Sequence, residues 1–306
     1  MDYLDLKLGY ACNNACAHCV VAGQREAALR RRGSGDRGTA ECRRELLDSL
    51  ARGIKAVTFT GGEPTIRPDF LGLLEFAAGR GLFVTVQSNG RMFAYPPFAA
   101  AAARLAGRFV IALHGPNAAV HDRVTGVPGS FLQTALGIRN LVKAGAFVLG
   151  KAVITRANYR HLPGLVRRLA GLGAGGANVA FPHASGGAWE NFEAVVPRYR
   201  EVLPHVRAAI RAAAGARPGG FPLEFEAIPP CLLRGAESYC ADLPRRPACR
   251  SELKQLDVTI RDWQRARAGS KAKGPACRRC RYGGACEGVW REYPARYGFS
   301  ELKPVL

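Results

Sequence analysis

The sequence lacks the long apolar segment that a membrane-spanning helix requires. Such a helix takes roughly 20 uninterrupted apolar residues, whereas the most apolar stretch, residues 98–113, is broken by Arg104 and Arg108. The N-terminal residues MDYLDLKLGYACNNAC also lack the basic and then apolar plan of a secretory signal peptide. These absences predict a cytoplasmic protein that makes no use of a membrane.

Lysine and acidic residues are both scarce. Of the 44 basic residues only 8 are lysine, and only 24 residues are acidic, which leaves a net charge of +20. A field of this size attracts nucleic acids, nucleotides or acidic peptides. Abundant arginine, alanine and glycine are also typical of a GC-rich genome, in which case the charge says nothing about a partner. Nucleic acid is therefore not the partner that the sequence favours.

Ten cysteines without a signal peptide favour metal or redox chemistry over disulfides. Three of them lie close together at Cys12, Cys16 and Cys19, and six lie between residues 231 and 286. Only Cys42 lies apart from these groups. It falls within an expected helix, where we expect it to be a small buried side chain. This distribution predicts two metal sites in two modules.

Short β-rich runs alternate with helical patterns over the first 230 residues. The expected strands are residues 3–8, 56–60, 83–87, 109–113, 147–154, 178–181 and 223–226, and expected helices include residues 39–52, 70–80, 131–143 and 158–169. The strands are nearly continuous apolar runs, as buried parallel strands are. Repeated βα units predict an α/β fold with a parallel barrel or a doubly wound sheet. In a barrel the site lies at the C-terminal ends of the strands.

The first cysteine group, Cys12-x3-Cys16-x2-Cys19, directly follows the first expected strand. Three thiolates at this spacing can hold one 4Fe–4S cubane and leave its fourth iron without a protein ligand. An open metal position of this kind can bind a substrate. A structural zinc site normally takes four ligands, and His18 is a poor fourth ligand because its neighbour Cys19 already occupies the same turn.

This spacing resembles the radical S-adenosylmethionine (SAM) superfamily, and further landmarks follow in the family's order. Gly61-Gly62-Glu63-Pro64 follows the second strand, as the GGEP motif of the family does. Ser88-Asn89 follows the third strand and His114 follows the fourth. The resemblance covers residues 3 to about 155. It implies a partial (β/α)6 TIM-like barrel over residues 1–227.

The resemblance also implies cofactors and the residues that bind them. Cys12, Cys16 and Cys19 would hold a 4Fe–4S cluster, and the SAM-binding residues would be His18, Gly61, Gly62, Glu63, Pro64, Ser88, Asn89 and His114. Lys151, in the fifth strand, is a candidate for the SAM carboxylate or the substrate, with a solvated lysine as the alternative. A reductant such as flavodoxin or ferredoxin would supply one electron. SAM would then give methionine and a 5′-deoxyadenosyl radical, which takes a hydrogen atom from the substrate.

The second group, Cys277-x2-Cys280-x5-Cys286, resembles the SPASM and twitch domains of the same superfamily, which bind one or two auxiliary 4Fe–4S clusters. Residues 228–306 would form this small domain. The full SPASM pattern continues with a cysteine four residues later, where this chain has Trp290. The arrangement with two complete auxiliary clusters is therefore in doubt.

Three ligand arrangements remain open for the second group. In the favoured one, Cys231 completes a single cubane with Cys277, Cys280 and Cys286, because Pro229 and Pro230 would hold Cys231 rigidly. In the second, Cys240 and Cys249 contribute to two triads, and in the third the thiols hold zinc. Cys240 or Cys249 is also a candidate hydrogen donor to a substrate radical, as a cysteine is in some peptide epimerases of the superfamily.

The first functional hypothesis is a maturase that cross-links, epimerises or oxidises a ribosomally synthesised peptide, since SPASM-like tails accompany peptide substrates in the family. The alternative is an enzyme that acts on an anionic small molecule in cofactor or natural-product biosynthesis, which the lack of an obvious leader-binding domain favours. RNA modification is third. A non-catalytic, metal-stabilised nucleic-acid-binding protein explains the charge but not the GGEP motif. The basic stretch 261–281 would bind an acidic leader peptide or phosphate, or form a solvated face.

Overall fold

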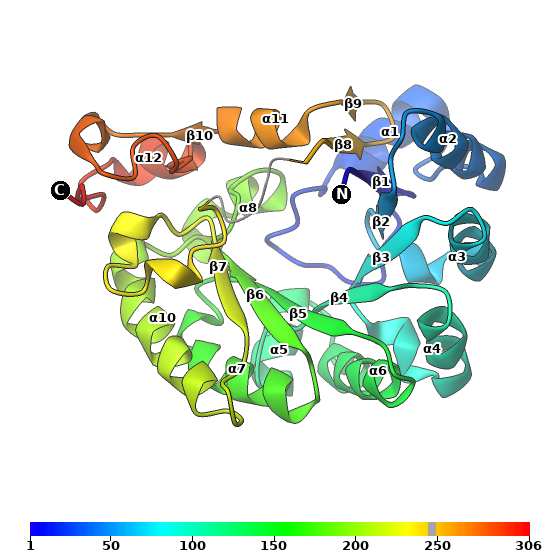
Figure 1. The fold of residues 1–306 in the computed structure, drawn as a ribbon, viewed down its shortest axis with the longest axis horizontal. Helices are drawn as coiled ribbons and strands as arrows, with labels where there is room; N and C mark the ends of the chain where they lie inside the picture. The colour runs from blue at the N-terminus through cyan, green and yellow to red at the C-terminus, as the bar shows by residue number, and fades with distance from the viewer. Residues whose placement is uncertain (244–248) are drawn as a thin grey trace.

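The computed structural model describes residues 1–243 and 249–306, and it contains all seven expected strands. They are β1 (Tyr3–Lys7), β2 (Ala56–Thr60), β3 (Phe83–Ser88), β4 (Arg108–Ala112), β5 (Val148–Val153), β6 (Gly176–Ala180) and β7 (Leu223–Glu226). Each strand pairs in parallel with the next, so the sheet keeps the order of the sequence. Figure 1 shows the sheet curving around a central space with helices outside it. The predicted α/β partial barrel is confirmed.

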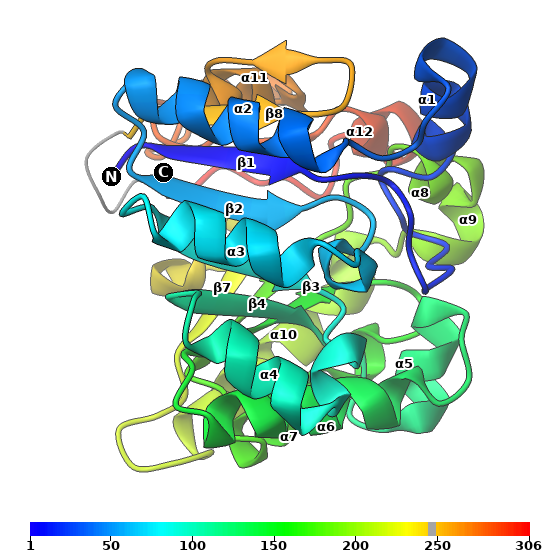
Figure 2. The ribbon, with the colours of Figure 1, turned by 90° about the vertical axis from the view of Figure 1, so that its right-hand side faces the viewer.

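Helices lie around this sheet, most of them on its convex side (Figures 1 and 2). They are α1 (Gln24–Arg32), α2 (Thr39–Ala51), α3 (Phe70–Ala78), α4 (Pro96–Ala103), α5 (Ala118–Thr125), α6 (Ser130–Lys143), α7 (Leu162–Gly171), α8 (Gly187–Glu190), α9 (Phe192–Val195) and α10 (Tyr199–Ala214). Alternate strand residues such as Leu4, Phe59 and Phe109 are fully buried in the core. Because side chains alternate across a strand, the intervening residues face the concave side, where many are only half-buried.

The C-terminal segment adds a strand to the barrel sheet. Strand β8 (Ser251–Lys254) pairs in parallel with β1, from Tyr3 opposite Ser251 to Leu6 opposite Lys254, and β9 (Thr259–Ile260) follows antiparallel to it. Over the described residues the main sheet therefore has nine strands, in the order β7-β6-β5-β4-β3-β2-β1-β8-β9. Residues 228–306 are thus joined to the barrel by backbone hydrogen bonds, a connection that the predicted division at residue 227 did not include.

The remaining C-terminal elements run along the gap between β1 and β7 (Figures 1 and 2). They are α11 (Trp263–Gly269), β10 (Lys271–Ala272), the 3-10 turn η6 (Pro275–Arg279), β11 (Val289–Trp290) and α12 (Glu292–Tyr297). Strands β10 and β11 form a short antiparallel ribbon. Among the helices described, none has the length and apolarity to cross a membrane.

Candidate functional site

The first three cysteines lie on the loop that follows β1, at residues 8–23, which we call the cysteine loop. Cys12 is exposed, Cys16 and Cys19 are half-buried, and all three thiols are free. Burial, and then the neighbouring Cys19 and Cys12, raise the pKa of Cys16 to about 12. Thiolates that repel one another in this way are stabilised by a cationic iron centre. The donor set therefore fits an iron–sulfur cluster.

The glycine pair after β2 lies against the backbone of the cysteine loop. The N–H of Gly62 donates to the carbonyl of Gly9 at 2.8 Å. Gly61 has a φ of +143°, and a Cβ there would lie 2.2 Å from the Gly9 oxygen. A Cβ on Gly62 would lie 2.3 Å from the carbonyl oxygen of Ala11. The glycines thus allow the backbone of the cysteine loop to approach closely, and their predicted contact with SAM stays a prediction.

Replacing Gly62 with alanine is expected to displace the cysteine loop, because the new Cβ meets backbone that cannot move independently. The iron bound per chain after anaerobic reconstitution should fall by about half, the share of one of two 4Fe–4S clusters. The control is Gly72→Ala on α3, where a Cβ meets nothing within 4 Å. A Gly62→Ala variant with the iron content of the control would contradict this account of the glycine.

Glu63 joins the loops that follow β2 and β3. Its side chain is buried, and Oε1 accepts hydrogen bonds from the Thr65 N–H at 3.0 Å, the Thr65 hydroxyl and the Ser88 hydroxyl at 2.8 Å. Oε2 accepts from the N–H of Asn89 at 2.6 Å. Burial raises the pKa of Glu63 and these donors oppose the rise. The carboxylate thus positions the loop after β3, and its contact with the SAM amino group stays a prediction. Pro64 is buried at the start of the 3-10 turn η1 (Pro64–Ile66).

Arg91 ties the cysteine loop to the loop after β3, and the sequence analysis missed it. Its guanidinium donates to the carbonyl of Asn13 and to the Asn14 side chain at 2.9 Å, while Nε donates to Gln133 at 2.6 Å. Asn89 adds a hydrogen bond to the Asn13 side chain at 2.6 Å. Sequence position could have indicated this contact, since Arg91 directly follows the Ser88-Asn89-Gly90 landmark and Asn13 lies between Cys12 and Cys16.

Three histidines pack together beside the cysteine loop. The rings of His18 and His114 lie 4.9 Å apart edge to face, and those of His114 and His121 lie 5.8 Å apart. Burial lowers the pKa of His18 to about 4, and burial also lowers the pKa values of His114 and His121. Nδ1 of His18 is buried without a hydrogen-bond partner among the described residues. Uncharged imidazoles with an open hydrogen-bonding position fit the predicted contact with a nucleobase such as the adenine of SAM.

Lys151 points across the concave side of the sheet toward β6 and β7. Its ammonium donates to the Asn178 side chain at 2.5 Å and pairs with Glu226. The charge of Lys151 is the main cause that lowers the pKa of Glu226 to about 2. Lys151 is thus half-buried and paired, not freely solvated, and its predicted contact with the SAM carboxylate stays a prediction.

A cluster of charged side chains, which we call the charge cluster, joins the end of β7 to the C-terminal segment. Arg267 pairs with Asp242 at 2.6 Å, Glu287 at 2.6 Å and Glu226 at 3.4 Å. Lys271, whose side chain is 0% exposed, pairs with Asp242 at 2.9 Å and Glu287 at 2.7 Å. The cations are thus balanced by three carboxylates. Because of these contacts, Arg267 and Lys271 do not belong to a solvated face, which was one interpretation of residues 261–281.

Trp290 lies beneath the charge cluster, at the position where the SPASM pattern has a cysteine. The ammonium of Lys271 is 5.0 Å from its ring centre, and the ring of His183 stacks on it at 3.9 Å with planes 11° apart. The indole is buried. Trp290 therefore packs against His183 and Lys271 at the position where the full SPASM pattern has a cysteine.

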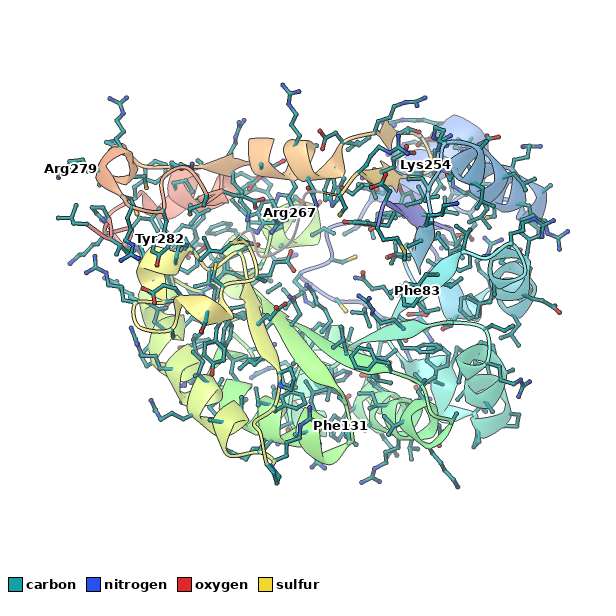
Figure 3. All side chains as sticks on the ribbon, viewed as in Figure 1. Phe83, Phe131, Lys254, Arg267, Arg279 and Tyr282 are labelled. Carbon is teal, nitrogen blue, oxygen red and sulfur yellow. The ribbon has the colours of Figure 1, made fainter. Side chains whose placement is uncertain are left out.

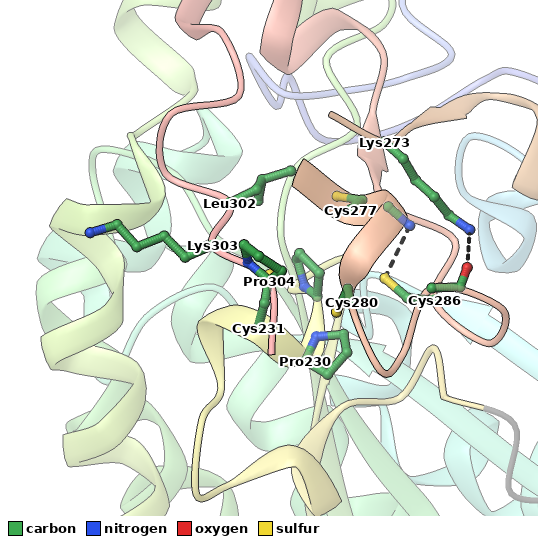
Figure 4. Close-up of a pocket in the computed structure, with 12 residues that line it drawn as sticks. Pro230, Cys231, Lys273, Cys277, Cys280, Cys286, Leu302, Lys303 and Pro304 are labelled. Carbon is green, nitrogen blue, oxygen red and sulfur yellow. Dashed lines mark hydrogen bonds between the residues drawn. The ribbon is translucent and has the colours of Figure 1, made fainter. Parts of the chain in front are cut away.

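Cys231, Cys277, Cys280 and Cys286 line one pocket beneath the C-terminal segment, the four-thiol pocket (Figure 4). Burial, followed by Cys286, Cys277 and Cys280, raises the pKa of Cys231 to about 12. Backbone N–H groups of Gly288 and Val305 donate to the sulfurs of Cys286 at 3.3 Å and Cys280 at 3.4 Å. Such hydrogen bonds to sulfur accompany cluster ligation. Among the described side chains, no three Cys, His, Asp or Glu are arranged around a single metal ion.

Cys240 and Cys249 do not line this pocket, although burial, followed by Asp242 and Cys286, raises the pKa of Cys240 to about 11. Cys240 is fully buried in the core, and its thiol donates to the Ile228 carbonyl at 3.4 Å. Cys249 accepts a hydrogen bond from Gln264 at 3.6 Å and precedes β8, which places it near Tyr3 at the start of β1. The cysteine loop lies at the opposite end of that strand. A hydrogen-donor role for either thiol stays a prediction.

The model of the radical SAM superfamily matches residues 6–169, which is more than half of the chain. The chain therefore belongs to the radical SAM superfamily. Members of this superfamily use a 4Fe–4S cluster and SAM, and the cysteine loop fits both.

The related proteins are named for different reactions. The chain is 32% identical to the AdoMet-dependent heme synthase of Oleidesulfovibrio alaskensis over 63% of this chain and 49% of the relative. It is 35% identical to the mycofactocin maturase MftC of Mycobacterium tuberculosis over 52% and 39%, and 26% identical to the PqqA peptide cyclase of Rhodopseudomonas palustris over 72% and 57%. The chain thus spans about half, or less, of the length of the first two relatives.

Solved structures share the fold. Native anSMEcpe with bound AdoMet and the Kp18Cys peptide matches 99% of this chain and 93% of its own, with a TM-score of 0.68 and 13% identity. Streptococcus suis SuiB bound to the precursor peptide SuiA matches 68% and 46%, with a TM-score of 0.52 and 17% identity. At these identities the likeness concerns the fold alone.

Proposed function

We propose that this protein is a radical SAM enzyme that takes a hydrogen atom from a ribosomally synthesised peptide. The observation that carries the proposal is the cysteine loop, where three free thiols are held against the glycine pair at the C-terminal end of β1. When bound, the cluster and SAM supply a 5′-deoxyadenosyl radical.

The chain's own residues position these groups. Cys12, Cys16 and Cys19 would hold the cluster. Glu63 and Arg91 fix the surrounding loops through the hydrogen bonds described above, so the thiols are preorganised. His18 and His114 would provide an uncharged wall for the adenine. The concave side of the sheet, with Lys151 and Glu226 paired across it, would receive the substrate.

Two kinds of observation support a peptide substrate. One relative is named as a mycofactocin maturase and another as a peptide cyclase, and the two fold neighbours described above have a peptide bound. The heme synthase relative supports the second candidate, an anionic small-molecule substrate, at comparable identity.

The four-thiol pocket is proposed to hold one auxiliary 4Fe–4S cluster with Cys231, Cys277, Cys280 and Cys286 as ligands. Four thiols complete a cubane, and the lining of one pocket by all four cysteines supports this ligand set. We also infer a cytoplasmic location, where free thiols persist, and a flavodoxin-like or ferredoxin-like reductant.

Anaerobic reconstitution with iron and sulfide, followed by dithionite and SAM, tests the reaction. We expect 5′-deoxyadenosine, measured by liquid chromatography. Its absence from a chain that binds iron would overturn the enzyme proposal. Precursor peptides encoded beside the gene, and iron porphyrin precursors as the comparison, then test the substrate. Loss of hydrogen from a peptide, measured by mass spectrometry, supports the first candidate, and modification of only the porphyrin precursor supports the second.

A further inference from the structure

The structure divides the basic stretch at residues 261–281 into two parts. Arg267 and Lys271 turn inward and belong to the charge cluster. The cations that follow stay exposed near the four-thiol pocket. Together with one residue near the C-terminus they form a set that we call the basic collar: Lys273, Arg278, Arg279, Arg281 and Lys303.

The collar is exposed and carries uncompensated charge. All five side chains are exposed, and none of them forms an ion pair with a residue that the structure describes. Figure 3 shows Arg279 extending outward from the C-terminal segment. Other basic residues of the chain, such as Arg52 and Lys254, are paired with Glu252 and Glu45. Five unpaired cations on one small surface create a local positive potential.

Three members of the collar line the same pockets as the thiols. Lys273 and Lys303 line the four-thiol pocket itself (Figure 4). Arg278 lines the adjoining hollow with Cys277. The Lys273 ammonium also donates to the Gly283 carbonyl at 2.6 Å, between two of the cysteines. Cys277, Cys280 and Cys286 are only half-buried. A cluster held by these thiols therefore lies close to a positively charged outer surface.

We propose that the basic collar is the docking surface for an acidic one-electron carrier protein of the flavodoxin or ferredoxin type. The inference rests on the auxiliary cluster of the proposed function. Transient electron-transfer complexes use small interfaces, and complementary charge steers such partners to one site. In the docked complex the reduced carrier loses one electron to the auxiliary cluster, and no atom is transferred.

A compact group of exposed cations is better suited to a folded carrier protein than to an extended peptide. An acidic leader peptide needs a groove along which its residues lie in sequence. The collar residues instead gather at the four-thiol pocket and the hollow beside it. Binding of an acidic leader peptide at this surface is the competing outcome, and the experiment separates the two.

The experiment compares three charge-reversal variants of the reconstituted full chain. The first is Arg278→Glu, Arg279→Glu and Arg281→Glu in the collar. The second changes Arg104, Arg139 and Arg167, which are exposed on the helices around the barrel or directly after one, and so alters the net charge equally. The third changes Arg25 and Arg30 on α1, beside the cysteine loop. Binding of a purified acidic flavodoxin is measured by titration calorimetry across salt concentrations.

We expect the collar variant to weaken flavodoxin binding about 10-fold or more at low salt and to reduce its salt dependence, because exposed charge pairs govern such encounters. The other two variants should change the dissociation constant less than about threefold. Formation of 5′-deoxyadenosine with dithionite should be unchanged in all three, whereas flavodoxin-driven formation should fall only in the collar variant.

Three results would overturn the inference. Equal weakening in the first two variants would show that only net charge matters. Stronger weakening in the Arg25/Arg30 variant would place the carrier beside the cysteine loop. Collar-dependent binding of a synthetic acidic peptide, without collar-dependent flavodoxin binding, would assign the surface to a leader peptide. A chain inactive even with dithionite would instead contradict the proposed function, and the binding titrations would still decide where flavodoxin docks.

Discussion

Replacing Cys12, Cys16 and Cys19 together with alanine is expected to abolish 5′-deoxyadenosine formation while leaving about four irons per chain, the content of one cubane. The reason is the separation of the two thiol groups. The first three thiols lie on the cysteine loop at the end of β1, and the other four line a pocket of their own. Iron analysis and the characteristic absorbance of the reconstituted variant measure the result.

Two further variants act as controls for this prediction. Cys249→Ala should keep the iron content and activity of the parent protein, because Cys249 contacts Gln264 outside the four-thiol pocket. Adding Cys231→Ala to the triple variant should remove most of the remaining iron. A triple variant without iron would show that the four-thiol pocket holds no cluster, and an effect of Cys249→Ala as large as that of Cys231→Ala would favour the two-triad arrangement.

Replacing Lys271 with methionine should lower the free energy of unfolding by about 3 kcal/mol, because breaking a buried ion pair leaves uncompensated charge. The Lys271 side chain is 0% exposed and contacts the carboxylates of Asp242 and Glu287 within 2.9 Å. Arg267 also pairs with both carboxylates and limits the loss. Urea unfolding of the reconstituted protein, followed by circular dichroism, measures the change.

A matched substitution and a double variant test the origin of that loss. Lys55→Met changes an exposed lysine and should alter stability by less than about 0.5 kcal/mol. Combining Lys271→Met with Asp242→Asn should cost less than the sum of the two single changes, since the residues are in direct contact. Strict additivity would mean that the ion pair does not stabilise the fold.

The sequence was sufficient for the barrel strands and for the cysteine loop because both follow from local patterns. Buried parallel strands are apolar runs, and the Cys12, Cys16 and Cys19 spacing is short-range. The predicted ends of some elements differ from the observed ends by a residue or two. Strand β6, for example, begins at Gly176 and not at residue 178. The separation of Cys240 and Cys249 from the four-thiol pocket needed the fold, because it depends on where β7 and β8 lie.

Features stabilised by distant partners could not be predicted. Strand β8 reads Ser-Glu-Leu-Lys, without an apolar run, yet Ser251 and Glu252 are buried there because Glu252 pairs with Arg52 at 2.8 Å. Arg267 and Lys271 sit in a basic stretch that resembles a solvated face. Their carboxylate partners are Asp242 and Glu287, and nothing local to the stretch indicates that these four residues come together.

The parallel pairing of β8 with β1 has a consequence for how the protein can be divided. A fragment that stops at residue 227 would leave one edge of β1 open, with the backbone donors and acceptors that face β8 between Tyr3 and Leu6 unpaired. That same strand leads directly into the cysteine loop. The strand that leads into the cysteine loop is thus covered by the segment that leads to the four-thiol pocket, so truncation at residue 227 is expected to expose this strand and to destabilise the cysteine loop.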